Sequence, residues 1–265
     1  MRIKASYYRL GMLAFTLALL YPLIGLATPV GPWQWDGGIA GSTSSAVRVS
    51  LLLTGAALVV DVGIGTPAAF YLARAQGPDT ILWEGAVLIS VLMPPLAIGI
   101  LLSIAFGPQT ALGAFLLRLG ILTSNSRLAF IATQIYVSIG YYIVAARAAF
   151  AAVPREFELI AGLLGSRPGQ VFRRVTLPLA RLGLAAAVSI AWVRALGEFG
   201  AVIITSYYPS GMPVQLWVNL QDSGMPAVMP LLVIFILSAL PLPWLIHLLA
   251  RRDPEGGSSA ARAGH

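Results

Sequence analysis

The sequence predicts an all-α integral membrane protein with six membrane-spanning helices. Of its 265 residues, 58% are hydrophobic and only 10% are charged, and the mean hydropathy is +0.83. Soluble domains are roughly 25% charged, so a water-soluble fold of this length could not cover so much apolar surface. Apolar runs close to the ~20 residues that cross a bilayer recur along the chain. Basic residues gather between these runs with a strong bias, which gives the orientation.

Six apolar runs are long enough to span a bilayer as helices. Strands of a transmembrane barrel would be short and alternating, and these runs are not. The first run is read as a retained helix, because no small-x-small cleavage site precedes Gly31. An even number of spans places both ends of the chain on one side. The predicted spans are Leu10–Ala27, Val49–Ala73, Gly85–Phe106, Leu128–Ala146, Leu182–Ile204 and Ala227–Leu249.

Basic residues assign both ends of the chain to the cytoplasm. If the N-terminus is cytoplasmic, 13 of the 17 lysines and arginines lie in inner segments, 3 lie in outer segments, and Arg194 lies inside a span. This distribution is the positive-inside bias of a multi-pass protein of the cytoplasmic membrane. The net charge of +7 then reports orientation and not nucleic-acid binding. Aromatic residues typical of the outer interface follow the first and fifth spans: Trp33, Trp35, Tyr207 and Tyr208.

Prolines interrupt several of the predicted spans. Each proline removes a backbone donor and bends a helix, and an ordinary kink is the favoured reading for any single one. Met93-Pro94-Pro95 is the exception, because two adjacent prolines make a sharper break, and these three residues are the candidates for a helix break or gate. The other interrupting prolines are Pro67, Pro230, Pro241 and Pro243.

The long basic segment Val153–Ala180 begins with the pattern of a short amphipathic helix. Pro154 suits the first turn, where its missing N–H is not needed, and Glu156 and Glu158 complement the helix dipole there. Gly165 is a natural terminator. The residues between them predict an apolar ridge at helical spacing, made of Phe157, Ile160, Leu163 and Leu164.

A second short helix is predicted to follow, capped by Ser166, with Arg173 and Arg174 in its last turn and Leu177-Pro178 closing the segment. Such a pair of helices fits a docking element for a partner protein. It fits equally a hairpin on the membrane surface whose arginines contact anionic lipid. Physical reasoning from these residues does not separate the two.

The spacing in this segment resembles the signature loop of ATP-binding-cassette importer permeases. That loop runs Glu-Ala-Ala, three residues, Gly, nine residues, a β-branched residue, one residue, Leu-Pro. The triplet here reads Leu159-Ile160-Ala161, so its glutamate is missing and Glu158 lies one residue early, which puts in doubt the salt bridge usual for that glutamate. The resemblance implies a coupling helix that inserts into a cytoplasmic ATPase. It assigns this coupling to Glu156, Phe157, Glu158, Ile160, Ala161, Leu164, Gly165, Val175, Leu177 and Pro178.

The fifth span resembles that of molybdate, tungstate and sulfate permeases through the residues Arg194 to Ala201, which read RALGEFGA. The continuations Tyr207-Tyr208-Pro209 and Met225 to Pro230 are most similar to molybdate/tungstate members, and Met93-Pro94-Pro95 with Gly99 matches their third span. The resemblance covers roughly residues 45–249. It implies the type I importer permease fold and import of a tetrahedral oxyanion, molybdate or tungstate, with sulfate or thiosulfate as the alternative.

The resemblance also implies an assembly. It places a permease domain at residues 45–250, with the coupling loop at 153–180, after an N-terminal segment at 1–44 that holds the first span and an outer loop. Composition predicts a disordered tail at 251–265. The implied partners are a second copy of this chain, two cytoplasmic ATPases that carry ATP and Mg²⁺, and an extracytoplasmic molybdate/tungstate-binding protein. Candidate contacts for that protein are Tyr207, Tyr208 and Trp217.

Three charged residues fall deep inside predicted spans, where a charge costs at least ~2.5–3.5 kcal/mol. Asp61 lies 13 residues from both Arg48 and Arg74, at the middle of its span. Arg194 and Glu198 are four apart and share a helix face. That face either lines the transport path or forms a buried, self-neutralising pair, with Asp61 as a possible third member; the buried pair is the favoured reading. Asp61 is expected to be paired, protonated or turned towards protein.

Chemistry needed for catalysis is missing from the sequence. No GxxxxGK[ST] loop is present, and Lys4 is the only lysine, so the chain cannot bind ATP through a P-loop. Cysteine is absent, HExxH is absent, and His247 and His265 have no partner at metal-ligand spacing. We therefore expect a transport subunit that is not an enzyme, binds no cofactor or metal of its own, and has no nucleic-acid partner. A membrane-embedded enzyme or an autonomous channel is the remote alternative.

Overall fold

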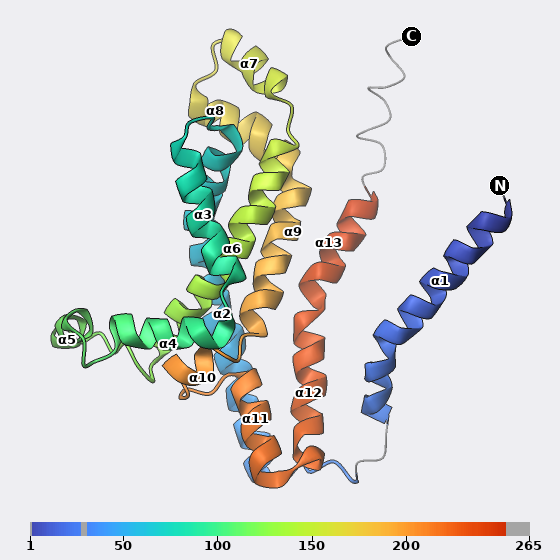
Figure 1. The fold of residues 1–265 in the computed structure, drawn as a ribbon, viewed down its shortest axis with the longest axis vertical. Helices are drawn as coiled ribbons and strands as arrows, with labels where there is room; N and C mark the ends of the chain where they lie inside the picture. The colour runs from blue at the N-terminus through green and yellow to red at the C-terminus, as the bar shows by residue number, and fades with distance from the viewer. Residues whose placement is uncertain (1, 28–30, 253–265) are drawn as a thin grey trace.

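The structure is a computed structural model that describes residues 2–27 and 31–252, and this part of the chain contains helices and no strand. Figure 1 shows an elongated bundle with one arm that projects sideways. In order, the helices are α1 (Arg2–Leu20) with the 3₁₀ turn η1 (Tyr21–Ala27), α2 (Gly37–Arg74), α3 (Asp79–Leu92), α4 (Pro95–Phe106), α5 (Ala111–Arg118), α6 (Arg127–Ala151), α7 (Arg155–Leu163), α8 (Pro168–Val171), the π turn η2 (Phe172–Thr176), α9 (Leu177–Leu196), α10 (Val202–Thr205), α11 (Met212–Ser223), α12 (Met225–Ala239) and α13 (Pro241–Arg252).

The centre of the bundle is formed by α2, α6 and α9, which pack on one another along their length. Their contact surfaces carry small residues, and Ala69, Ala146, Ala187 and Ala191 are completely buried. Small side chains let helix backbones approach closely, and the resulting van der Waals packing helps to hold helices together in lipid. A second shell of helices borders this core: α3 packs on α6, and α12 and α13 pack along α2 and α9. The core therefore holds α2 and α9, the helices that carry the predicted intramembrane charges.

The helix α1 lies apart from the bundle, and its described side chains are exposed (Figure 1). The beginning of α1, the end of α13 and α7 all lie at the same end of the molecule (Figure 1). This arrangement agrees with the even number of spans expected from the sequence. Their assignment to the cytoplasm stays a prediction.

Within residues 2–27 and 31–252, five helical stretches are long and apolar enough to cross a membrane, and a bent pair of helices makes a sixth if it counts as one span. The bent pair is α3 and α4, which meet at an angle of 112°. The bend follows Met93 and Pro94, so the sharp break predicted there is confirmed. The predicted span Gly85–Phe106 is therefore not a straight crossing, and the arm in Figure 1 consists of α4 and α5.

The expected end of the fifth span is wrong. The fifth span does not reach Ile204, because α9 ends at Leu196 and only a short α10 follows. Gly197 and Gly200 favour helix poorly, and Glu198 Oε1 instead accepts the Ala201 N–H at 2.7 Å, so the chain turns there. At Pro67 the helix α2 continues without a break, which is compatible with the ordinary kink favoured for a single proline. One lost hydrogen bond is tolerated where α6 and α9 hold the neighbouring turns.

The segment 153–180 contains α7 as predicted, but its second helix does not end at Arg174. The N-cap of α8 is Arg167, one residue after the predicted cap Ser166. From there the helix runs through η2 into α9 without a break. Pro178 lies in the first turn of α9 and supplies no backbone donor, and the wider π turn before it lets the helix continue. Residues 251–252 of the predicted disordered tail belong to α13, and the rest of that tail lies outside the described residues.

Candidate functional site

One end of the bundle presents α7, whose C-terminus is closed by a glycine in a left-handed conformation. Gly165 has φ +85°, a backbone conformation that residues other than glycine adopt only at a cost in free energy. The Ser166 N–H donates to the Ala161 carbonyl at 3.1 Å, and the Gly165 N–H donates to the Gly162 carbonyl at 2.9 Å. These two bonds form a Schellman motif, which ends α7 sharply and returns the chain towards α8.

The predicted apolar ridge of α7 is exposed. Leu163 is 88% exposed and Leu164 is 82% exposed, and Phe157 and Ile160 are each about half exposed. An uncovered apolar surface of this kind marks a site of contact with another protein or with lipid. Residues at α7, in η2 and at the start of α9 also line a shallow groove of about 380 Å³. Its lining includes six of the residues that the sequence assigned to coupling: Phe157, Ile160, Ala161, Leu164, Val175 and Pro178.

Glu158 differs from its neighbours on α7, because it faces the bundle. It forms an ion pair with Arg74, the last residue of α2, at 2.8 Å, whereas Glu156 is exposed. Burial raises the pKa of Glu158, but hydrogen bonds from Arg74 and Thr176, with the charges of Arg74 and Arg155, outweigh it and hold this pKa below its ordinary value of 4.5. The carboxylate is therefore ionised at neutral pH and fixed to the end of α2.

Deep in the bundle, a polar layer joins α2, α6 and α9. Asp61 is fully buried, and its Oδ2 lies 2.5 Å from the Ser138 hydroxyl on α6. Ser138 Oγ also lies 2.6 Å from the Gln134 carbonyl, and the Gln134 side chain donates to the Ala195 carbonyl on α9 at 3.1 Å. Asp61 forms no ion pair with Arg194 in the described part of the chain, so it is turned towards protein and is not a third member of that pair.

Arg194 and Glu198 form an ion pair at the end of α9. The Glu198 side chain is 1% exposed and the Arg194 side chain is 20% exposed. The Arg194 guanidinium lies 5.4 Å from the centre of the Tyr141 ring, and the Tyr141 hydroxyl donates to the Val91 carbonyl near the end of α3. The positive charge is thus balanced by a carboxylate and an aromatic face, and it is positioned beside the two places where helices break.

The two helix breaks contact each other. The break after Met93-Pro94 lies against the break between α9 and α10, and α4 packs on α10. A Cβ atom on Gly99 would lie 2.8 Å from the Ala201 carbonyl oxygen, and one on Gly200 would lie 3.0 Å from Pro95 Cβ. Only glycine allows the two backbones to come this close. Irregular backbone at membrane depth is typical of helices that border a transport path.

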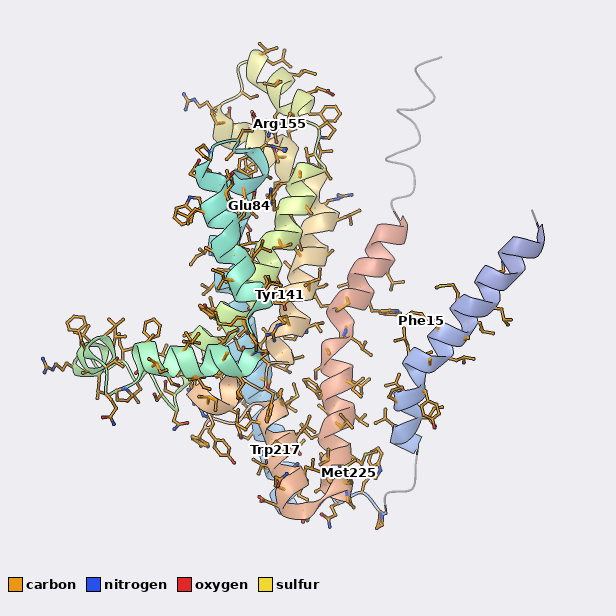
Figure 2. The ribbon with its side chains drawn as sticks, viewed as in Figure 1. Phe15, Glu84, Tyr141, Arg155, Trp217 and Met225 are labelled. Atoms are coloured by element: carbon orange, nitrogen blue, oxygen red, sulfur yellow. The ribbon has the colours of Figure 1, made fainter. Side chains whose placement is uncertain are left out.

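Trp217, one of the aromatic residues expected to contact an outer partner, lies at the end of the bundle opposite α7, and Tyr207 and Tyr208 lie in the segment between α10 and α11. Figure 2 shows Trp217 on α11 at this end and Arg155 on α7 at the other, with Tyr141 between them. Tyr207 is 49% exposed, Tyr208 is 72% exposed and Trp217 is 45% exposed. Trp217 also packs on Phe199, with 5.9 Å between the ring centres. These side chains are available to a partner.

Sequence reasoning missed three residues of these sites. In the sequence, Arg74 is one of the inner positive charges, and no nearby residue indicates its contact with Glu158, which is 84 residues away. Gln134 and Ser138 are polar residues four apart within an apolar span, a spacing that could have indicated one polar helix face opposite Asp61. The described residues contain no cluster of histidine and acidic side chains that could hold a metal ion.

Known proteins resemble this chain over most of its length. It is 36% identical over 224 residues to a probable molybdenum ABC transporter permease protein of Haloferax volcanii, covering 82% of this chain and 77% of the relative. It is 31% identical over 224 residues to the molybdenum transport system permease protein of Mycobacterium bovis, covering 83% and 85%. A sulfate transport system permease protein of Salmonella typhimurium is 26% identical over 249 residues, covering 91% and 90%.

A solved bacterial alginate ABC transporter, in complex with a pentasaccharide-bound periplasmic protein, has the same fold, with a TM-score of 0.73 and 17% identity over 95% of this chain and 96% of that one. A family match covers residues 62–252, which include both helix breaks, the intramembrane ion pair and the α7 segment. The family consists of transport components and not of enzymes. The chain belongs to the family described as the inner membrane component of binding-protein-dependent transport systems.

Proposed function

We propose that this chain is the membrane-spanning permease subunit of an ATP-driven importer for molybdate and tungstate. The observation that carries the proposal is the α7 segment, in which an exposed apolar ridge ends at Gly165 with the residue spacing of an ATPase-coupling loop. Two relatives with 36% and 31% identity are named for molybdenum, which supports this group of oxyanions over sulfate. The sulfate relative is less similar, at 26%.

The proposed assembly contains two copies of this chain, with the transport path between them. Each α7 segment docks on one cytoplasmic ATPase, which holds ATP and Mg²⁺, and the permease itself binds no cofactor. An extracytoplasmic binding protein for molybdate or tungstate delivers the anion at the other end of the bundle. Tyr207, Tyr208 and Trp217 are the proposed contacts for that protein, since all three side chains are exposed.

In the proposed mechanism, closure of the two ATPases on ATP brings the two α7 helices together. The helices then tilt as rigid bodies between inward-facing and outward-facing arrangements. The helix breaks at Met93–Pro95 and Gly197–Ala201 are the proposed hinge and gate region, because the regular backbone hydrogen bonds are already interrupted there. Selectivity resides mainly in the binding protein.

The intramembrane arginine fits transport better than tight binding. A free positive charge on the path would hold a divalent anion too strongly for release, because charges attract far more strongly in a medium of low dielectric constant than in water. Arg194 is instead paired with Glu198, so its field is largely cancelled. We therefore expect the chain to have no high-affinity anion site of its own.

Reconstitution tests the proposal. The chain is placed in proteoliposomes with its ATPase and its binding protein, and uptake of radiolabelled molybdate is measured with and without ATP. ATP-dependent uptake that unlabelled tungstate suppresses, and that equimolar sulfate leaves unchanged, is expected. Suppression by sulfate alone would transfer the assignment to the sulfate group. Uptake that needs no ATPase would indicate an autonomous channel, and turnover of a substrate without transport would indicate an enzyme.

Substitution of Gly165 tests the coupling segment. Gly165→Val forces a β-branched residue into the left-handed region, at about 1–2 kcal/mol, although its Cβ would meet no atom within 4 Å. We expect this variant to insert normally and to lose ATP-driven uptake. Gly165→Asn is the matched control, because asparagine adopts this conformation more readily, and it should keep most of the uptake. Equal uptake by both variants would contradict the role of the Gly165 turn.

A further inference from the structure

We propose that Arg74 is a positioning residue that transmits the movement of α7 to α2. It does so through the α7 clamp, which we define as Arg74, Glu158, Thr176 and the Val153 carbonyl. This inference rests on the proposed coupling function of α7. The clamp provides a fixed connection within this chain, at the end of the bundle where the ATPase is proposed to dock.

The central contact of the α7 clamp is a bidentate ion pair. Arg74 Nε donates to Glu158 Oε2 at 3.0 Å, and Arg74 Nη2 donates to Glu158 Oε1 at 2.8 Å. Two parallel bonds between a guanidinium and a carboxylate fix both the distance and the orientation of the groups. The Arg74 side chain is 15% exposed and the Glu158 side chain is 17% exposed, so water competes weakly for these bonds.

Two further bonds connect the pair to neighbouring elements. Arg74 Nη2 donates to the Val153 carbonyl after α6 at 3.1 Å, and the Thr176 hydroxyl in η2 donates to Glu158 Oε1 at 2.7 Å. Arg155 also donates to the Arg74 carbonyl at 3.1 Å. The clamp therefore joins the end of α2, the end of α6, α7 and the turn η2 that leads into α9. A rigid displacement of α7 cannot leave the end of α2 in place without breaking the ion pair.

The clamp stands on a packed aromatic base. The Arg74 guanidinium lies 5.9 Å from the centre of the Phe70 ring. Phe70 packs edge-on against Phe150 and Phe172, with ring centres 5.4 and 4.9 Å apart. These rings come from α2, α6 and η2, which are three of the four elements that the clamp joins. These packed rings limit movement of the Arg74 side chain relative to α6 and η2, because a close-packed interior deforms little.

The two faces of α7 have different roles under this proposal. Leu163 and Leu164 are exposed and are left free for the ATPase, whereas Glu158 is turned inward towards Arg74. Glu158 lies one residue before the position at which the signature loop has its glutamate. We infer that this carboxylate forms its ion pair within the permease. A displacement of the exposed ridge by the ATPase is then transmitted to α2 through this ion pair.

The first experiment measures the clamp without any partner. The chain has no cysteine, so Gly162→Cys gives a unique position on α7 for a spin label. A Cβ there would meet no atom within 4 Å. We expect Glu158→Gln and Arg74→Lys to increase the mobility of this label, because each loses part of the bidentate pair. Glu84→Gln is the matched control, since it breaks the ion pair with Arg147, which does not reach α7. Unchanged mobility in both clamp variants would overturn the assignment of the clamp.

The second experiment measures coupling in proteoliposomes with the ATPase and the binding protein. We expect Glu158→Gln and Arg74→Lys to lower the molybdate transported per ATP hydrolysed by about fivefold, while ATP hydrolysis itself continues. A folding defect would lower both activities together. The double variant Arg74→Glu with Glu158→Arg restores a pair of opposite charges and should recover part of the ratio.

The outcomes separate the two proposals. If the unsubstituted chain shows no ATP-dependent uptake, the proposed function fails, and the spin-label result still decides whether the clamp holds α7. If the unsubstituted chain transports and the clamp variants keep its ratio of molybdate to ATP, the role of Arg74 in transmission is refuted. The same conclusion follows if Glu84→Gln lowers the ratio as much as Glu158→Gln.

Discussion

Gly99→Ala tests the contact between the two helix breaks. The added Cβ would lie 2.8 Å from the Ala201 carbonyl oxygen, 2.9 Å from Ala201 Cα and 3.0 Å from Ile204 Cβ. Two of these three atoms belong to the backbone of the opposite break, so they cannot move without shifting it. Overpacking of this kind costs about 1–3 kcal/mol. Replacing glycine by alanine inside a helix returns about 0.5–1 kcal/mol, so we expect a net loss of about 1–2 kcal/mol in the free energy of unfolding.

The loss is measured by titrating the purified protein with sodium dodecyl sulfate in mixed micelles and following helix content. Gly55→Ala is the matched control, because it also lies inside a helix and its Cβ would meet no atom within 4 Å. The control should be as stable as the unsubstituted chain or slightly more stable. If Gly99→Ala unfolds at the same detergent fraction as Gly55→Ala, the close approach of the two breaks is refuted.

Three further predictions concern the charged and polar groups. Ser138→Ala removes the hydrogen bond to buried Asp61 and should lower the free energy of unfolding by about 1–3 kcal/mol. Ser189→Ala removes a buried hydroxyl that has no hydrogen-bond partner, so it should not lower this free energy. Equal losses in the detergent titration would refute this reasoning. Arg194→Ala leaves Glu198 buried without its partner, so it should cost about 3–5 kcal/mol, and adding Glu198→Ala should recover part of that loss in the same titration. The pKa of Glu158 lies below 4.5, so its contribution to holding α7 is complete above about pH 4.5 and is lost as the pH falls through the lowered value. A spin label on α7 should therefore keep its mobility between about pH 5 and 8 and become more mobile only in stronger acid; a change near neutral pH would contradict the assignment.

Much of the fold follows from simple properties of the sequence. Hydrophobic length predicts the spans because lipid forces every backbone group to bond within its own helix. Adjacent prolines predicted the break at Met93–Pro95, since two missing donors in succession cannot both be tolerated inside a helix. The early end of α9 could not be predicted from hydropathy. It depends on the Glu198 side chain accepting the Ala201 N–H, and Phe199 to Ile204 are apolar enough to continue a span.

The candidate site was predicted in its local parts and missed in its long-range parts. The α7 ridge, the turn at Gly165 and the Arg194–Glu198 pair depend on residues at most nine positions apart, so helical spacing reveals them. The Asp61–Ser138 contact joins residues 77 positions apart, and the Arg74–Glu158 pair joins residues 84 positions apart. The first contact depends on how α2 packs against α6, and the second depends on where the chain places α7 relative to the end of α2. Neither arrangement is indicated by hydropathy or by the spacing of nearby residues.

Because α2 is unbroken, it connects the α7 clamp at Arg74 to the buried polar layer at Asp61. Asp61 and Arg74 are 13 residues apart on this helix, or about 20 Å at 1.5 Å per residue. Since α2 continues through Pro67, we expect a displacement of Arg74 to move Asp61 as well, and we expect relative motion at the breaks in the other helices. Ile64→Gly should weaken this connection, because it places a third glycine between Gly63 and Gly65, and it should lower molybdate uptake. Val59→Gly is the matched control, because it removes an exposed β-branched residue from the same helix, at a similar cost of about 0.5–1 kcal/mol, on the far side of Asp61 from the clamp. If both variants lower uptake equally, loss of stability explains the effect and α2 does not act as the rigid link.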